Sequence, residues 1–230
     1  MRTSNIILLS LFLLVFGTAA ALAITLRYKI DHHLYDKLND KEPDSMEGVS
    51  INMPLSPFSE IVLDAYPGTI IRKGDANSIR WIRFKGVSAP PYILSGDSLV
   101  LRPQTGDPYA ANVTITVQDL RSIRLRSVSN CKIVGFKQDS LTIYGESLGD
   151  DDSVQSMDLK RLQLTLDGNK TLVLSNSAVG GLWLDLKNDA GLSLENARMG
   201  WIKGRWKGDI SLTADSATLQ NGIGKIEAIH

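Results

Sequence analysis

Residues 162–181 read LQLTLDGNKTLVLSNSAVGG, residues 182–201 read LWLDLKNDAGLSLENARMGW, and residues 202–217 read IKGRWKGDISLTADSA. Aligned in these rows of twenty, the segment shows three apolar columns. They are Leu162, Leu182 and Ile202; Leu166, Leu186 and Trp206; and Leu172, Leu192 and Leu212. Self-similarity at a fixed period is the mark of a repeat architecture. The segment therefore predicts stacked coils, with one row of the alignment in each coil.

Each predicted coil contains two short β-strands. In the run Leu172-Val173-Leu174, the two leucines point to one face of the strand and the middle residue points to the other. Two such strands, joined by turns rich in Asn, Asp, Ser and Gly, use about twenty residues. Each coil would lie about 4.8 Å from the next, with backbone hydrogen bonds between coils. The leucine columns then fill the interior.

Two columns of turn residues separate the predicted strands. They are Asn176, Asn196 and Ser216, and Asn169, Asp189 and Asp209. The first column predicts a ladder of stacked side chains. In the second, like charges about 5 Å apart repel unless a cation bridges them, which would suit a calcium site or an acidic sugar-binding strip. The alternative, which we prefer, is a set of surface turn residues selected for their backbone conformation.

Upstream of the repeat, apolar and polar residues alternate with period two, which predicts further short strands. Val113, Ile115 and Val117 form one such strand, and Ile123, Ile133 and Ile143 recur ten residues apart. Residues 145–158 interrupt this spacing with an acidic segment that includes Asp150–Asp152, and we expect a solvated loop there. The sequence predicts an all-β fold over residues 51–230, a short β-solenoid of two-strand coils.

An uncharged, apolar segment of 21 residues extends from Ile6 to Leu26. As a helix it would span about 32 Å, which matches the hydrocarbon core of a bilayer. We predict a transmembrane signal anchor here, with residues 1–5 as a short tail and residues 27–50 as a juxtamembrane helix and linker. The alternative is a signal peptide cleaved after Ala21 or Ala23, which would give a secreted protein.

The orientation of the predicted anchor rests on two opposing observations. Arg27 and Lys29 follow the apolar segment, and the positive-inside rule places such residues in the cytoplasm. However, an N-terminal export segment followed by one β-rich domain is typical of extracytoplasmic proteins. We predict that the domain of residues 51–230 faces the periplasm or the exterior, and that the lipid bilayer is a partner through residues 6–26.

The composition excludes several classes of function. With 25 Lys and Arg against 25 Asp and Glu, the chain has no basic excess to neutralise phosphates, so we expect no nucleic-acid partner. Cys131 is the only cysteine, which excludes an intrachain disulfide and a cysteine zinc site and predicts a buried structural thiol. Because the sequence has no serine-nucleophile, metal-binding histidine or phosphate-loop motif, we predict no catalytic, metal-binding or cofactor-binding residue and no cofactor.

One candidate interaction surface lies in the repeat. Trp183 takes the outward position of Leu182-Trp183-Leu184, and Lys187, Lys203 and Arg205 are near it in the rows. An exposed aromatic ring with basic neighbours is suited to stack on a sugar or on a partner's surface. The alternative is that the tryptophans cover the last coil, because solenoids need capped ends. We prefer capping or packing as the role of these tryptophans.

The order of the strand motifs resembles that of a known family. The motifs are Phe58–Ile61 (FSEI), Thr69–Asp75 (TIIRKGD), Ser98–Leu101 (SLVL) and Val113–Val117 (VTITV), followed by Leu120, Ile123 and Leu125. They resemble the GIN-type family, which comprises candidate autotransporter adhesin head domains and is abundant in Bacteroidetes. The resemblance covers about residues 55–230 and consists of generic β-strand motifs. The Gly-Ser-Gly turns frequent in that family are replaced here by turns such as Ser175–Ala178 (SNSA).

The resemblance implies an anchored or secreted β-solenoid-like domain used in surface adhesion, and it supplies no catalytic residues. We therefore predict a non-enzymatic extracytoplasmic module for adhesion or envelope structure, with a protein or glycan partner. One alternative is a carbohydrate-binding or carbohydrate-active β-helix, in which Asp185, Lys187, Arg205 and Asp209 would supply the charges. A second alternative is a signal-sensing domain of the envelope.

Overall fold

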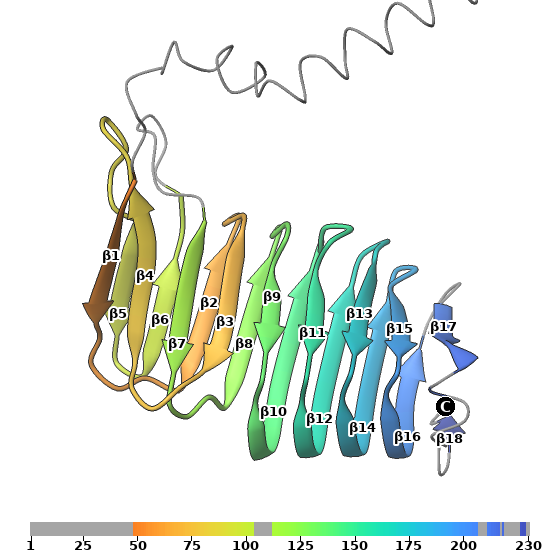
Figure 1. Cartoon of the computed structure of the whole chain (residues 1–230). Helices are drawn as coiled ribbons and strands as arrows, with labels where there is room; N and C mark the ends of the chain where they lie inside the picture. The colour runs from red at the N-terminus through yellow and green to blue at the C-terminus, as the bar shows by residue number, and fades with distance from the viewer. Residues whose placement is uncertain (1–47, 104–111, 207–210, 217, 219–225, 229–230) are drawn as a thin grey trace, which may run out of the picture. The chain divides into compact units, whose positions relative to one another are not determined.

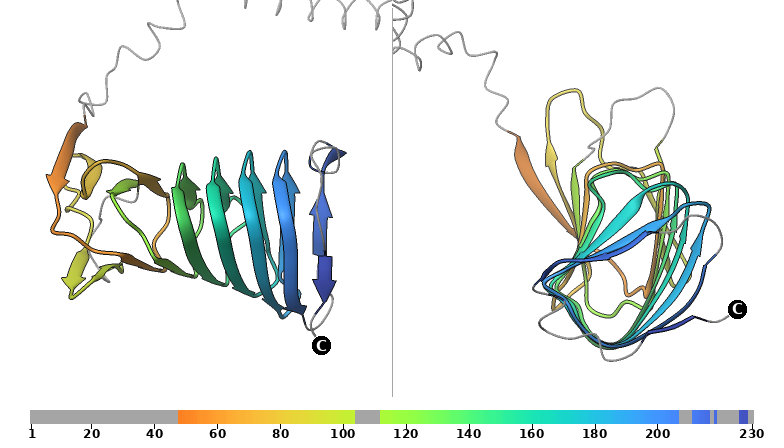
Figure 2. Two further views of the ribbon diagram at one scale, coloured as in Figure 1. Left: turned by 90° about the horizontal axis from the view of Figure 1, so that it is seen from below. Right: turned by 90° about the vertical axis from the view of Figure 1, so that its right-hand side faces the viewer.

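The computed structural model describes residues 48–103, 112–206, 211–216, 218 and 226–228. These residues form a β-solenoid whose coils lie side by side (Figure 1) and surround one apolar interior (Figure 2). The predicted tail, anchor and most of the linker fall in residues 1–47, which lie outside the described residues. Within the described part of the chain, no helix is long and apolar enough to cross a membrane.

Two sheets form the walls of the solenoid. Sheet A contains, in spatial order, β1 (Val49–Pro54), β4 (Ser78–Arg83), β7 (Val113–Val117), β3 (Thr69–Lys73), β9 (Lys132–Val134), β11 (Ser153–Gln155), β13 (Thr171–Ser175), β15 (Gly191–Glu195) and β17 (Ser211–Ala214). Sheet B contains β5 (Tyr92–Ser95), β6 (Ser98–Leu101), β2 (Glu60–Asp64), β8 (Ser122–Arg126), β10 (Lys137–Glu146), β12 (Asp158–Asp167), β14 (Ala178–Lys187), β16 (Arg198–Trp206) and β18 (Ile226–Ala228).

The register of the parallel strands confirms the twenty-residue columns. Leu162 pairs with Leu182, which pairs with Ile202, and Leu172 is aligned in the same way with Leu192 and Leu212. The first three of these side chains are fully buried. Because side chains alternate between the faces of a strand, one face of each strand fills the core and the other faces outward.

The coils differ from the prediction in the length of their strands. Each regular coil combines a ten-residue strand of sheet B, such as β12 or β14, with a strand of three to five residues in sheet A. Within β14, a Cβ atom at Gly180 would lie 2.8 Å from the carbonyl oxygen of Lys160 in the neighbouring coil. Glycine therefore permits the close approach of the two backbones at this position.

The acidic segment of residues 145–158 does not interrupt the stack, contrary to the prediction. Its strand β11 pairs with β9 on one side and with β13 on the other. Ile133 pairs with Val154, and Val154 pairs with Leu174. The number of residues from Ile133 to Val154 is therefore larger by one than the number from Val154 to Leu174. The segment belongs to a coil with one additional residue, which the turn before β11 accommodates.

Asp152 explains how this turn is held. The expectation of a solvated loop is correct for Asp150 and Asp151, which are exposed, and wrong for Asp152, which is fully buried. Its Oδ1 accepts a 2.7 Å hydrogen bond from the N–H of Cys131, and its Oδ2 accepts one of 2.7 Å from the N–H of Gly149. Burial raises the pKa of the Asp152 carboxyl, although these two donors favour the ionised form.

Cys131 is a buried thiol, as the sequence predicts. Burial, and secondarily the charge of Asp152, raises the pKa of this thiol far above its ordinary value. Since the thiolate is the reactive form of cysteine, Cys131 is an inert part of the core.

The N-terminal part of the stack departs from the order of the chain. The coil of β2 and β3 lies between β6 and β7 on one side and β8 and β9 on the other. Beyond β6 and β7, the strands β1, β4 and β5 pair in antiparallel orientation. The stack therefore begins with antiparallel strands and continues as a parallel solenoid.

The corners of the coils contain residues in the left-handed backbone conformation. After the strands of sheet A, these are Gly135, Ser156, Asn176 and Asn196. The N–H of each of the first three donates to a carbonyl of the next coil, for example from Asn176 to Glu195 over 2.9 Å. Glycine and asparagine are the residues that adopt this conformation most readily, which accounts for the turn composition.

At the corner that follows β15, side chains instead of backbone carbonyls accept the hydrogen bonds of the N–H groups. The N–H of Asn196 donates to the carboxylate of Asp215, with Asp215 oxygens 3.0 and 3.1 Å away. The N–H of Ala197 donates to the hydroxyl of Thr218 over 2.9 Å. Asp215 and Thr218 thus cap the corner of the β15 coil in place of backbone carbonyls.

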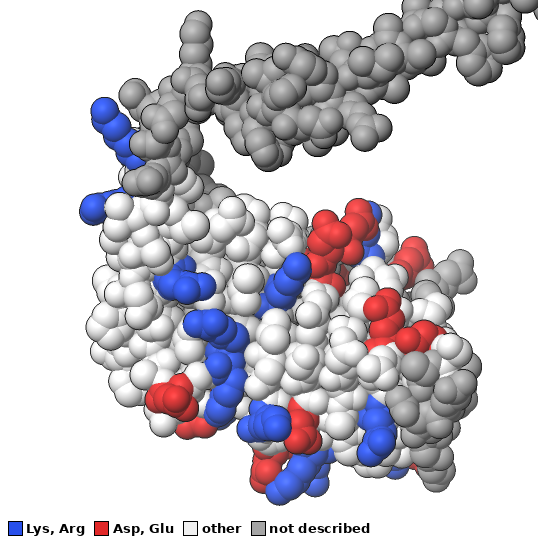
Figure 3. Space-filling model, in the orientation of Figure 1, with Lys and Arg blue, Asp and Glu red and all other residues white. Residues whose placement is uncertain are grey.

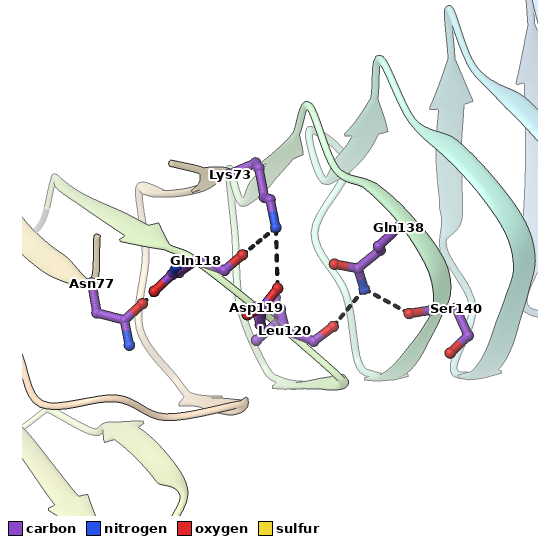
Figure 4. A network of polar contacts seen from close by, with 7 residues as sticks. All are labelled: Lys73, Asn77, Gln118, Asp119, Leu120, Gln138 and Ser140. Carbon is purple, nitrogen blue, oxygen red and sulfur yellow. Dashed lines mark hydrogen bonds and ion pairs between the residues drawn. The ribbon is translucent and has the colours of Figure 1, made fainter. Parts of the chain in front are cut away.

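The less regular N-terminal corners are held by side-chain contacts to the backbone (Figure 4). Lys73 donates to the carbonyl of Gln118 and lies 3.4 Å from the carboxylate of Asp119. Gln138 donates to the carbonyls of Leu120 and Ser140 over 2.5 and 2.6 Å. These contacts fix the turns between the coils of β3, β8 and β10.

We expect Asn176→Ala to lower the free energy of unfolding by about 1–2 kcal/mol, the cost of placing an ordinary residue in the left-handed region. Asn176 has a φ of 49°, and its Oδ1 accepts a 2.7 Å hydrogen bond from Nδ2 of Asn196. Asn176→Gly is the control, because it keeps the backbone freedom and loses only the side chain. Urea unfolding measures both, and equal losses would exclude backbone conformation as the cause.

We expect Asp152 to reduce the stability of the fold as the pH rises. Because its folded-state pKa is raised, the folded chain holds this proton more tightly than the unfolded chain does, so the free energy of unfolding falls as the pH increases between the two pKa values. Asp152→Asn removes this dependence, and Asp151→Asn, at an exposed position, is the control. Urea unfolding between about pH 4 and about pH 7 tests it. A difference between the native chain and Asp152→Asn that stays constant with pH would contradict the assignment.

Candidate interaction surface

The outward side chains of sheet B form three rows that run across the coils, and we call this surface the sheet B face. The central row contains Ile93, Val100, Val62, Arg124, Tyr144, Thr165, Asp185 and Arg205. One flanking row contains Ser98, Glu60, Ser122, Thr142, Gln163, Trp183, Lys203 and Glu227. The other contains Asp64, Arg126, Glu146, Asp167 and Lys187.

The N-terminal half of the sheet B face is hollowed into an open groove of about 620 Å³. Val62 and Val100 form its apolar floor, and Tyr144 borders it. The tyrosine is 38% exposed, so the ring presents part of its surface to solvent. The guanidinium carbon of Arg124 lies 5.4 Å from the centre of this ring, which is a cation–π contact.

Ion pairs border the groove on both sides. Arg124 Nε lies 2.9 Å from Glu60 Oε1, and Arg126 Nε lies 3.1 Å from Glu146 Oε2. A third pair joins Arg102 to Asp64 at 2.6 Å. Each arginine on this part of the face is therefore matched by a carboxylate, and the groove offers both hydrogen-bond donors and acceptors without a field of one sign.

The four residues of the predicted interaction surface all lie at the C-terminal end of the sheet B face. Trp183 is half-buried, and Lys203 lies beside it in the register. Lys187 pairs with Asp185 at 3.3 Å, and Lys203 pairs with Glu227 at 2.7 Å. Arg205 is exposed beside Asp185.

A second tryptophan adds to this end of the face. The ring of Trp201 lies against Gly181, where the missing side chain leaves room for it. The amino group of Lys203 lies 5.8 Å from the centre of the Trp201 ring. Trp206 aligns with the buried Leu186, and its side chain lies outside the described part of the structure.

The predicted turn columns occupy two different corners. In one, Nδ2 of Asn196 donates to Oδ1 of Asn176 over 2.7 Å. In the other, Asn169 and Asp189 are exposed turn residues, and Asp209 lies outside the described residues. No group of three His, Cys, Asp or Glu residues is arranged to hold a metal ion in the part of the chain that the structure describes.

Sequence reasoning missed the groove and its residues Val62, Arg124 and Tyr144. Their neighbourhood depends on the placement of β2 between β6 and β8, which no sequence period indicates. One signal was present in the sequence. Outward residues alternate with buried ones on two strands twenty residues apart, at Arg124 and Arg126 on the first and at Tyr144 and Glu146 on the second. That alternation identifies outward positions in adjacent coils.

Comparison with known proteins gives a likeness of fold. No protein-family model matches the chain, and neither does a curated protein sequence. A crystal structure of a candidate adhesin from Bacteroides fragilis superposes with a TM-score of 0.50 at 14% identity, covering 80% of this chain and 98% of that protein. This likeness shows the fold, an all-β solenoid.

Two further crystal structures, both from Parabacteroides distasonis, are less similar. One is a candidate adhesin with a TM-score of 0.44 and 8% identity, covering 80% of this chain and 98% of that protein. The other is a candidate lipid-binding protein with a TM-score of 0.40 and 11% identity, covering 81% and 98%.

We expect the ion pairs of the sheet B face to contribute little to stability. Arg124→Gln and Arg126→Gln should each change the free energy of unfolding by less than about 1 kcal/mol, because exposed pairs are screened by water and salt. Leu164→Ala, at a fully buried core position, should cost about 2–5 kcal/mol in the same urea titration. A loss in Arg124→Gln as large as that in Leu164→Ala would mean that the face is structural.

Proposed function

We propose that this protein is a non-catalytic interaction module of the cell envelope, which binds a protein or glycan partner through the sheet B face. The observation that supports this most is the groove over Val62 and Val100, bordered by Tyr144 and by charged pairs. Apolar floors with aromatic and arginine side chains and a polar rim are typical of binding surfaces.

The rigidity of the face supports the same proposal. The residues of the groove floor stand on strands with a hydrogen-bonded neighbour on both sides, such as β2 between β6 and β8. Its backbone therefore loses little conformational freedom when a partner binds, which lowers the cost of association. A solenoid wall presents such a face without any further supporting element.

We further propose that the module is attached to the membrane and faces the periplasm or the exterior. The uncharged segment of residues 6–26 supports attachment, and the single export-type segment before one β-rich domain supports the orientation. The motif order that resembles the GIN-type family supports an adhesin-like role, as does the fold likeness to the Bacteroides fragilis candidate adhesin. A secreted form after signal cleavage is the alternative.

A glycan is the second candidate for the partner. Tyr144 offers part of a ring face, and Glu60, Asp64 and Glu146 offer carboxylates within the same groove. Sugars present hydroxyl donors to carboxylates and C–H surfaces to aromatic rings, which this combination matches.

We expect Tyr144→Ala and Arg124→Gln to weaken binding to the partner roughly 10- to 30-fold, as loss of a central aromatic or arginine does at interfaces. The full chain in lipid nanodiscs would be screened on a glycan array and against envelope protein extracts, and each hit would then be titrated with the variants. Arg72→Gln is the matched control, because Arg72 is an exposed arginine on sheet A.

Equal losses in Arg124→Gln and Arg72→Gln would contradict the assignment of the sheet B face. A depolymerisation assay on each glycan hit tests the non-catalytic part of the proposal. Release of shorter products by the native chain would overturn it.

A further inference from the structure

A second surface lies at the N-terminal end of sheet A. Three large apolar side chains are exposed on its outward side: Ile70 (40%), Ile82 (47%) and Phe84 (36%). They belong to β3 and the end of β4, which are neighbours through β7. We call this surface the N-terminal patch.

Gly48 connects the apolar side chains of the patch. A Cβ atom at this position would clash with Ile82 and would lie 2.8 Å from the ring of Phe84, so both side chains lie against the glycine. Gly48, Ile70 and Ile82 also line an open groove of about 490 Å³. Ile70, Ile82 and Phe84 therefore lie on the outward side of sheet A, whereas Val49 pairs with Arg83 and points to the opposite face.

The charged residues of the patch are basic. Arg80 and Lys132 line the groove, and its described lining contains no acidic residue. Lys85 follows the end of β4, and all three side chains are exposed. At the upper left of Figure 3, the basic side chains at the N-terminal end stand apart from acidic ones.

These cations differ from the arginines that border the groove of the sheet B face. Arg102, Arg124 and Arg126 are each paired with a carboxylate. By contrast, none of the three basic residues of the patch makes an ion pair with another residue in the described part of the chain. Within the described residues, no carboxylate competes for their charge with an external anion.

Along the chain, the patch begins a short distance after the proposed membrane segment. Gly48, which lines the groove, is preceded by residues 27–47 and these by the apolar residues 6–26. Even fully extended, the 21 residues of the connecting stretch reach at most about 75 Å. Attachment of residues 6–26 would therefore hold the patch at a high effective concentration next to the bilayer.

We propose that the N-terminal patch docks on an anionic bilayer surface. In this arrangement Ile70, Ile82 and Phe84 enter the boundary between headgroups and acyl chains, and the basic side chains contact lipid phosphates. Apolar insertion and electrostatic attraction together give a surface affinity that neither gives alone. The inference rests on the membrane attachment proposed above.

A second copy of the chain fits the patch less well. A two-fold dimer through this surface would place the same patch against itself. The cations of each patch, which make no ion pair within the described residues, would then face one another, and like charges across an interface disfavour association. A lipid surface supplies the opposite charge.

Docking of the patch would also orient the module. The groove of the patch lies on sheet A, whereas the proposed binding face is the outer side of sheet B. A bilayer held against sheet A leaves the sheet B face available to a partner.

The experiment uses the full chain in nanodiscs with a fluorophore on an introduced cysteine. Ser50→Cys is suitable, because Ser50 is exposed, lines the groove and pairs with Ile82 in the register. The native Cys131 is buried and does not compete for the label. Thr213→Cys, exposed at the other end of sheet A, is the control. Discs contain phosphatidylcholine alone or with phosphatidylglycerol, and lipids with a quencher in the headgroup region report docking.

We expect the label at position 50 to be quenched in discs with phosphatidylglycerol, less in discs of phosphatidylcholine alone, and less in high salt. The label at position 213 should be quenched in neither. Arg80→Gln and Lys132→Gln should each lower the ratio of docked to undocked chain about fivefold. The matched variants Lys137→Gln and Arg161→Gln, at exposed positions on sheet B, should leave it unchanged.

Equal quenching at both positions, or equal quenching in both kinds of disc, would overturn the docking proposal. Energy transfer between labels at position 50 in lipid-free detergent would show that a second copy covers the patch, which would also overturn it. A chain that fails to enter the discs would instead refute the membrane attachment. A chain that enters the discs with an unquenched label at position 50 refutes the docking alone.

Discussion

Backbone hydrogen bonds between neighbouring coils hold every other feature of this protein in place. In parallel strands a shift of one residue would turn the buried face of a strand outward. The columns of Leu162 and Leu172 therefore fix the register, and the register fixes which side chains form the sheet B face. The left-handed corners at Asn176 and its equivalents keep this register from one coil to the next.

The coil with the additional residue shows what the register demands. Val154 must pair with both Ile133 and Leu174, so the extra residue has to be absorbed in a turn. The turn absorbs it by burying Asp152, whose carboxylate binds backbone N–H groups that would otherwise lack a partner. Burial of this ionisable group costs free energy, and the continuity of the stack offsets that cost.

The sequence was informative where the chain is periodic. The spacing of Leu162, Leu182 and Ile202 was sufficient to predict parallel coils, their register and their core, because each coil repeats the same local environment. It could not show that β2 lies between β6 and β8, since that placement results from contacts distant in the chain. The groove at Tyr144 depends on this placement, so it could not be predicted from spacing alone.

The two ends of the stack cover their terminal backbone groups in different ways. A parallel solenoid leaves unpaired N–H and C=O groups at each end, and such edges invite association with other strands. Near the C-terminal end, the side chains of Asp215 and Thr218 accept the hydrogen bonds of the corner at Asn196 and Ala197. At the N-terminal end, the antiparallel strands β1, β4 and β5 cover the coil of β6 and β7, and apolar side chains are exposed beside cations that make no ion pair within the described residues. That combination suits an anionic lipid surface, and it lies at the end of the stack to which the proposed anchor is joined.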